Sequence, residues 1–129
     1  MPDKSLRILI VDDDVDNLAN LSDILSDIGH QTETACSGPS ALEKIAGNCQ
    51  HDDCPFDLCL LDFKMPGMDG VELLEKIHSQ QPKMPAIMIT AHAGEDGDKR
   101  ARAVDTFEVM PKPVDIKTLL GLIEAAIAS

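Results

Sequence analysis

The chain has 129 residues, of which 43% are hydrophobic, and a formal net charge of −12 at pH 7. This length suits one domain with its own core, and the scarcity of aromatic residues makes that core aliphatic. The negative charge argues against direct nucleic-acid binding, because phosphate backbones are bound by clustered Lys and Arg. The basic cluster of Lys99, Arg100 and Arg102 fits a solvated or partner-binding helix face better than a nucleic-acid site.

No stretch of the sequence approaches the roughly 18 consecutive apolar residues that a membrane span needs. The apolar run at residues 8–11 is too short for a signal peptide, because three acids follow it. We therefore predict a cytoplasmic protein of one domain, residues 1–129, with no output domain and no membrane contact. Disulfides are not expected there, and Cys59 should pack as a small hydrophobic residue in a strand.

Short apolar segments alternate with segments of helical spacing along the chain. Gly29 is the expected C-cap of the first helix and Asp115 the expected N-cap of the last, whose buried side should include Ile127. The weakest predicted helix covers residues 94–104, which contain two glycines and many charges. The predicted strands are 8–11, 31–35, 56–62, 86–90 and 107–111, and the predicted helices start after Asp14, at 37–39, near Gly70, at Gly94 and after Asp115.

This alternation predicts an α/β protein whose parallel sheet is covered by helices on both faces. Crossover connections between parallel strands are right-handed, which limits the possible topologies. Ligands of such sheets bind beyond the carboxyl ends of the strands, where the strand order reverses. The strand ends are therefore where functional side chains are expected.

Four predicted strands end in chemically active side chains. Three acids, residues 12–14, follow the first strand, and Asp62 ends the third strand. Thr90 ends the fourth strand, and Lys112 follows the fifth. If the strands are parallel neighbours, the acids of two strand ends, the hydroxyl of a third and the amine of a fourth meet at one edge of the sheet. Such a set of groups is suited to a divalent cation and a phosphoryl group.

Carboxylates brought together repel one another, and at an effective dielectric constant near 20 a pair about 4 Å apart costs about 4 kcal/mol before screening. The cluster therefore indicates a cation, and Mg²⁺ fits better than Ca²⁺ because the sequence has no calcium-binding loop. Asp62 would be the nucleophile of phosphoryl transfer, with Thr90 and Lys112 stabilising charge on the phosphoryl oxygens. The plain alternative, a surface salt bridge at Lys112 and a structural Thr90, does not account for four matching strand ends.

With these residues in place, the chain resembles the receiver domain of two-component response regulators over nearly its whole length. The segments that carry the resemblance are 8–14, 60–70, 89–91 and 112–113. The resemblance implies a flavodoxin-like, doubly wound parallel sheet of five strands in the order 2-1-3-4-5, with five helices. The polar stretch at residues 47–55 contains Cys, His and Asp but matches no zinc pattern, so we predict a surface loop there.

The resemblance also implies a role for each matching residue. Asp62 would be the phosphoacceptor, in a site that holds Mg²⁺, with Mn²⁺ as a possible substitute. Asp14 lies outside the metal-binding pair and should only shape the start of the first helix. The remaining roles are metal binding for Asp12, Asp13 and the backbone carbonyl of Lys64, phosphoryl binding for Thr90, the Ala91 backbone and Lys112, and a cis peptide bond at Pro113.

One position departs from the family pattern. The switch residue three positions before the lysine is usually Tyr or Phe, and here it is Val109. Phosphorylation chemistry should survive, but the conformational response should be smaller or differently built. Lys64 and His92 would flank the path of an attacking water and tune the lifetime of the acyl phosphate, with a solvated loop residue as the alternative for His92. The other histidines, His30, His51 and His78, are expected on the surface.

The phosphoryl donor implied by the resemblance is a sensor histidine kinase or a histidine phosphotransfer protein. Two outputs compete: contact with an unknown downstream protein, and onward transfer to another histidine. A receiver-like scaffold that works without phosphorylation is an alternative. A Mg²⁺-dependent phosphatase is disfavoured because Lys64 stands where a second Asp is needed, and a nucleotide- or flavin-binding module lacks its glycine-rich loop.

Overall fold

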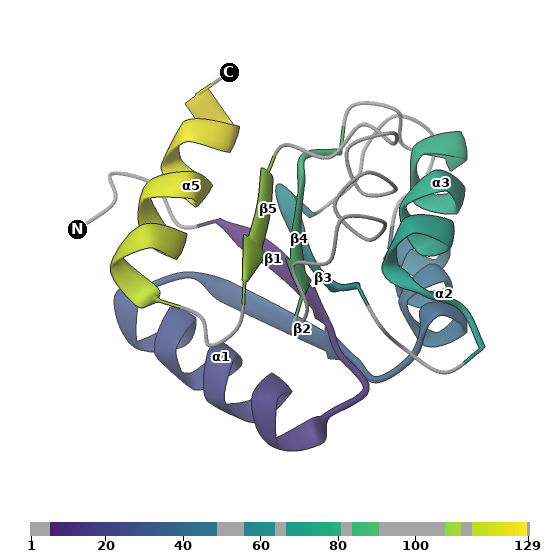
Figure 1. Ribbon diagram of the computed structural model, residues 1–129, viewed down its shortest axis with the longest axis horizontal. Helices are drawn as coiled ribbons and strands as arrows, with labels where there is room; N and C mark the ends of the chain where they lie inside the picture. Colours follow the sequence, from purple (N-terminus) through teal and green to yellow (C-terminus); the bar gives the residue numbers. More distant parts are fainter. Residues whose placement is uncertain are drawn as a thin grey trace.

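A computed structural model describes residues 6–48, 56–63, 67–80, 84–90, 108–111 and 115–128. Strands and helices alternate as predicted through residues 7–90, the part of the chain that ends with the fourth strand (Figure 1). Of the loop expected at 47–55, residues 47 and 48 are helical instead, and residues 49–55 lie outside the described residues. The helix expected at 94–104 also lies outside them. The strands are β1 (Arg7–Val11), β2 (Gln31–Ala35), β3 (Leu58–Asp62), β4 (Ala86–Thr90) and β5 (Glu108–Pro111), and the helices are α1 (Val15–Ile28), α2 (Gly38–Asn48), α3 (Gly70–Gln80) and α5 (Ile116–Ala128).

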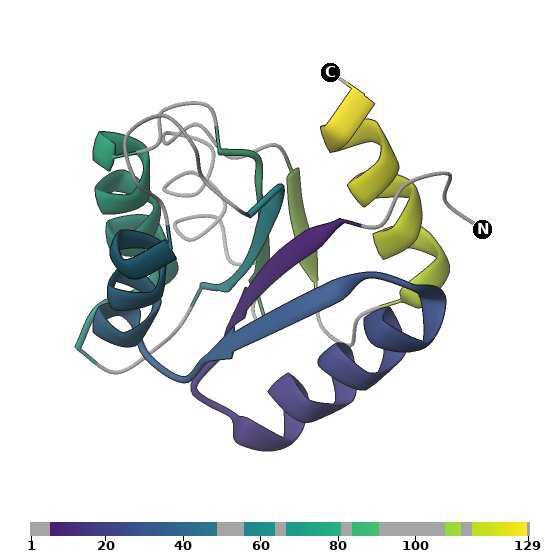
Figure 2. The same cartoon turned by 180° about the vertical axis from the view of Figure 1, so that it is seen from behind.

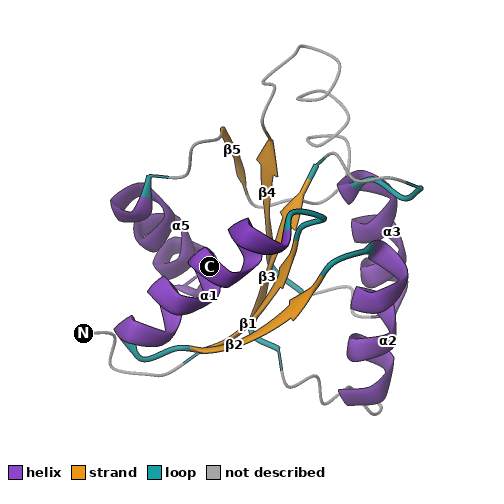
Figure 3. Cartoon of the chain, turned by 90° about the horizontal axis from the view of Figure 1, so that it is seen from below, coloured by secondary structure: helices purple, strands orange, loops and turns teal. Residues whose placement is uncertain are grey.

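The strands form one parallel sheet in the order β2-β1-β3-β4-β5. Helices α1 and α5 lie on one face of this sheet, and α2 and α3 lie on the other (Figure 3). A view from behind shows α2 and α3 next to each other, away from α1 and α5 (Figure 2). The predicted doubly wound α/β class with a parallel sheet is therefore confirmed. None of the described helices is long and apolar enough to cross a membrane.

The sheet separates two hydrophobic cores, because successive side chains of a strand point to opposite faces. In β1, Ile8 and Ile10 pack with residues of α1 and α5, whereas Leu9 and Val11 pack with residues of α2 and α3. Cys59 is fully buried in the second core, as predicted, and burial raises the pKa of its thiol to about 12. The central strands are thus buried on both faces, which explains their continuous apolar runs.

Polar caps fix where the helices begin and end. The Asp14 side chain caps α1 by accepting hydrogen bonds from the backbone N–H groups of Asp16 and Asn17. Gly29 ends this helix with a φ of 114°, a left-handed conformation that glycine adopts without steric cost. Asp115 caps α5 by accepting from the backbone N–H of Thr118. The hydrogen bonds from Thr118 lower the pKa of the Asp115 carboxyl.

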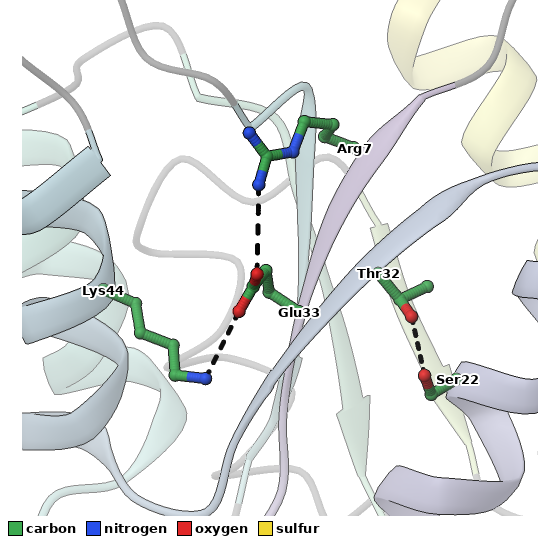
Figure 4. Close-up of polar contacts among 5 residues, drawn as sticks. All are labelled: Arg7, Ser22, Thr32, Glu33 and Lys44. Carbon is green, nitrogen blue, oxygen red and sulfur yellow. Dashed lines mark hydrogen bonds and ion pairs between the residues drawn. The ribbon is translucent and has the colours of Figure 1, made fainter.

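Strand β2 lies at one edge of the sheet and is tied to its neighbours by polar side chains (Figure 4). Glu33 lies 3.9 Å from the Arg7 guanidinium and 3.4 Å from the Lys44 ammonium. On the other face, the hydroxyl groups of Ser22 and Thr32 are 2.6 Å apart, which joins α1 to β2. These partly exposed contacts contribute little stability each, but they fix the position of an edge strand that has few buried residues.

Two sequence predictions about single side chains are wrong. His30 is not on the surface: only 6% of it is exposed, and its Nδ1 accepts a hydrogen bond from the backbone N–H of Leu6 at 3.2 Å. The residue follows the αL cap of α1, where the chain turns inward to start β2. Ile127 is 38% exposed rather than buried, because it lies near the end of α5.

His30 should make the stability of the protein depend on pH. Its Nδ1 can accept the Leu6 N–H only in the neutral form, and desolvation lowers the pKa of the ring below its ordinary value of 6.5. The unfolded chain therefore binds a proton more readily, so stability is complete above pH 6.5 and falls as the pH drops through that value. Urea unfolding at a series of pH values should show this loss.

His30→Gln should flatten the pH dependence below pH 6.5, since no titrating ring is left at this position. His78→Gln is the matched control, because His78 is half-buried on α3 and contacts the Met84 carbonyl rather than the Leu6 N–H. An unchanged slope in His30→Gln would show that His30 does not couple folding to protons.

Candidate functional site

The carboxyl ends of β1 and β3 bring three acidic side chains together. Val11 is opposite Leu61 in the sheet, so the residues that follow them, Asp12 and Asp62, leave neighbouring strands at the same level. Carboxylate oxygens of Asp12, Asp13 and Asp62 lie within 4.8 Å of one another. The predicted convergence of the acidic strand ends is thus present in the structure.

Burial distinguishes the three carboxylates. Asp12 is 4% exposed and Asp62 is 5% exposed, whereas Asp13 is open to solvent. Taking a charged carboxylate out of water is costly unless hydrogen bonds or a positive charge compensate it. Asp12 and Asp62 both have interaction partners, and a positively charged ligand would further offset the repulsion among the three neighbouring acids.

A network at the start of α1 holds Asp12 in place. The backbone N–H of Asp14 donates to Asp12 Oδ1 at 2.9 Å, and the Asn17 amide donates to Asp12 Oδ2 at 3.3 Å. Asp14 itself is exposed and caps α1, in agreement with the prediction that it shapes the start of this helix. The contribution of Asn17 was not predicted. Its position three residues after the N-cap, where side chains reach back past the helix start, was the available signal.

The segment after β3 packs tightly against the site. The Phe63 N–H donates to the Ile89 carbonyl at 2.7 Å, and the Gly70 N–H donates to the Phe63 carbonyl at 2.8 Å. Gly67 has a φ of 83°, so the turn between these residues needs a glycine. A Cβ on Gly70 would lie 2.6 Å from the Asp62 carbonyl oxygen. The helix start therefore approaches the backbone of Asp62 as closely as glycine permits.

The acidic cluster fits a hard divalent cation. All three ligand groups are carboxylates, which Mg²⁺ and Ca²⁺ prefer over nitrogen or sulfur ligands. Opposite ligands of an octahedral cation with metal–oxygen distances of about 2.1 Å are about 4.2 Å apart, so ligand atoms within 4.8 Å of one another need only a small adjustment to bind one. The group could thus hold a metal ion and leave coordination positions for water or a phosphate oxygen.

The structure describes the other predicted site residues only in part. Thr90 is the last residue of β4 and is opposite Pro111 of β5, so its backbone lies at the same end of the sheet as Asp62. Val109 is opposite Met88 within the β4–β5 pair. The remaining residues, Lys64, Ala91, His92, Lys112 and Pro113, lie outside the described residues.

Comparisons with known proteins agree on one family. The response regulator receiver domain family matches residues 8–124. The DNA-binding transcriptional regulator NtrC of Escherichia coli (strain K12) is 35% identical over 121 residues, covering 94% of this chain and 24% of NtrC. A response regulator receiver protein of Anaeromyxobacter sp. (strain Fw109-5) is 38% identical over 116 residues, covering 90% of this chain and 46% of that protein.

A solved structure covers nearly the same length as this chain. The CheY-like response regulator receiver domain protein from Methanospirillum hungatei JF-1 superimposes with a TM-score of 0.85 and 34% sequence identity. The match covers 97% of this chain and 95% of that one. The two sequence relatives are longer, and this chain spans less than half of either.

Proposed function

This chain belongs to the response regulator receiver domain family, and from that premise we propose that it accepts a phosphoryl group on Asp62 in two-component signalling. The observation that carries the proposal is the buried Asp62 carboxylate at the end of β3, beside Asp12 and Asp13. An isolated buried acid could be structural. A buried acid in a carboxylate cluster at the carboxyl edge of a doubly wound sheet has the setting of a reactive group.

The reaction transfers a phosphoryl group from a histidine nitrogen to a carboxylate oxygen. A carboxylate oxygen of Asp62 attacks the phosphorus of a phosphohistidine on a histidine kinase or a phosphotransfer protein. The P–N bond breaks, the imidazole leaves with its electron pair, and an acyl phosphate forms on Asp62. The protein assists its own phosphorylation and hydrolysis in this scheme and has no separate substrate.

Mg²⁺ fits the oxygen donors of the site, and it would neutralise charge on the phosphoryl oxygens during transfer. Asp12, Asp13 and Asp62 would hold the ion, together with the backbone carbonyl of Lys64, and Mn²⁺ could replace it. Thr90, the Ala91 backbone and Lys112 would bind the phosphoryl group. The position of Thr90 at the end of β4 supports this assignment, and those of Ala91 and Lys112 rest on the sequence motif.

We also infer that the domain has the full five strands and five helices, with the remaining helix in the long connection between β4 and β5. The sheet order and the length of that connection support this inference. Val109 is the proposed switch position, and Lys64 and His92 the residues that tune the acyl phosphate lifetime. The output would be contact with a downstream protein or transfer to another histidine.

Intact mass spectrometry after incubation with acetyl phosphate and Mg²⁺ tests the proposal. The wild-type chain should gain the mass of one phosphoryl group, and EDTA should prevent the gain. Asp62→Ala should gain nothing, because the attacking oxygen is gone. Asp57→Ala is the matched control: Asp57 precedes the same strand but accepts from the Arg7 N–H, far from the acidic cluster along β3.

A gain that persists in Asp62→Ala would assign the phosphoryl group to another residue and contradict the proposal. No gain from acetyl phosphate calls for a phosphorylated histidine kinase as donor. No gain from either donor, with no Mg²⁺ binding by calorimetry, would favour the scaffold that works without phosphorylation. Release of phosphate from small phosphate esters would instead indicate the phosphatase.

A further inference from the structure

Asn17 is a polar residue of α1 whose side chain points at the acidic cluster. The Asp14 side chain, which caps α1, accepts a hydrogen bond from the backbone N–H of Asn17. Asn17 therefore lies in the first turn of the helix. The side chain is half-buried, and its Nδ2 lies 3.3 Å from Asp12 Oδ2. The amide therefore directs the positive end of its N–H dipole at one of the carboxylates proposed to hold the cation.

The metal-free form of this site has an electrostatic problem. Three carboxylates within 4.8 Å repel one another, and burial of Asp12 and Asp62 removes much of the water that would screen them. Every donor to these carboxylates stabilises the metal-free form. A bound Mg²⁺ supplies two positive charges to the same oxygens, so the same donors matter less once the ion is present.

We propose that Asn17 stabilises the metal-free acidic cluster through its hydrogen bond to Asp12 and thereby lowers the affinity of the site for Mg²⁺. The affinity for Mg²⁺ reflects the difference in free energy between the metal-bound and metal-free forms, so a group that stabilises the metal-free form weakens binding. A cation held by these carboxylates would also repel the positive end of the N–H dipole, which points at Asp12. Asn17 thus sets the Mg²⁺ concentration at which the proposed phosphoryl transfer can operate.

A different role for Asn17 would be to orient Asp12 for the metal, which would raise the affinity instead. The distances favour the first role. The Asp14 N–H holds Asp12 Oδ1 at 2.9 Å, and the Asp12 side chain is almost fully enclosed. This shorter bond stays when the longer 3.3 Å bond from Asn17 is removed, so Asp12 keeps its orientation but loses part of its charge compensation.

The inference rests on the proposed Mg²⁺ site and is tested by Asn17→Ala without any phosphoryl donor. Calorimetric titration with MgCl₂ should give a Kd about threefold lower than that of the wild-type chain. In EDTA, the urea midpoint of Asn17→Ala should be lower than that of the control variant, Asn20→Ala. Saturating Mg²⁺ should remove most of this difference between the two midpoints. Asn20→Ala is the control, because Asn20 is exposed on the same helix and undergoes the same gain in helix propensity.

An unchanged or higher Kd for Mg²⁺ in Asn17→Ala would overturn the inference and leave the proposed function intact. No Mg²⁺ binding by the wild-type chain would instead contradict the proposed site itself. Asn17→Asp is a second variant that keeps the size of the side chain and adds a carboxylate. It should lower the urea midpoint in EDTA further and bind Mg²⁺ more tightly than the wild-type chain, and weaker binding would also overturn the inference.

Discussion

Asp13→Asn should make the metal-free protein more stable and remove most of its affinity for Mg²⁺. Asp13 is the exposed member of the acidic cluster, so its charge repels Asp12 and Asp62 without being needed for packing. Even with the screening of water, two unit charges about 4 Å apart repel by about 1 kcal/mol, so a gain of about that size is expected in EDTA. Urea unfolding measures this gain.

The same substitution removes one anionic ligand from the proposed cation site. The Kd for Mg²⁺ should rise by about tenfold or more, because an amide oxygen carries no net charge to attract the ion. Asp23→Asn is the control: it removes the same charge from an exposed position farther along α1. If both variants changed stability and affinity equally, the effect would come from the net charge of the protein and not from the cluster.

Opposite effects on stability and on metal affinity would have a simple structural cause. The acids at the ends of β1 and β3 are costly for folding and useful only when a cation or a phosphoryl group is present. Asn17 and the Asp14 N–H reduce this cost from the α1 side without removing any ligand. The site therefore combines carboxylates that repel one another with hydrogen-bond donors that offset part of this repulsion.

The sequence predicted the parts of this protein that depend on local patterns. Continuous apolar runs indicated strands buried on both faces, and helical spacing with caps indicated the helices between them. Residues at the carboxyl ends of neighbouring parallel strands meet, so the proximity of Asp12 after β1 and Asp62 at the end of β3 followed from topology alone. These predictions needed no knowledge of how side chains pack.

The contacts of His30 and Asn17 could not be predicted as easily. His30 is buried because its ring accepts the N–H of Leu6, which is 24 residues away in the sequence. For a histidine between a helix and an edge strand, no local sequence pattern distinguishes a buried side chain from an exposed one. Asn17 is closer in sequence to its partner, but its amide could equally face solvent, and the cap geometry at Asp14 decides its direction.

Gly70→Ala should destabilise the fold and disturb the backbone of the proposed phosphoacceptor. A Cβ at this position would lie 2.6 Å from the Asp62 carbonyl oxygen and 2.6 Å from Met88 Sδ, and 3.1 Å from Phe63 Cα. The Met88 side chain is buried, and the other two atoms belong to the backbone, so the start of α3 must move away. We expect a loss of about 2 kcal/mol or more in urea unfolding, typical of overpacking.

Gly121→Ala is the matched control, because a Cβ on Gly121 in α5 would have no heavy atom within 4 Å. That variant should be more stable by about 0.5–1 kcal/mol, since alanine loses less backbone entropy than glycine in a helix. Gly70→Ala should in addition take up phosphoryl groups more slowly from acetyl phosphate under conditions where it remains folded, because the shift reaches Asp62 through Phe63. Wild-type stability in Gly70→Ala would mean that α3 can move at no cost, and the close approach would then not constrain the site.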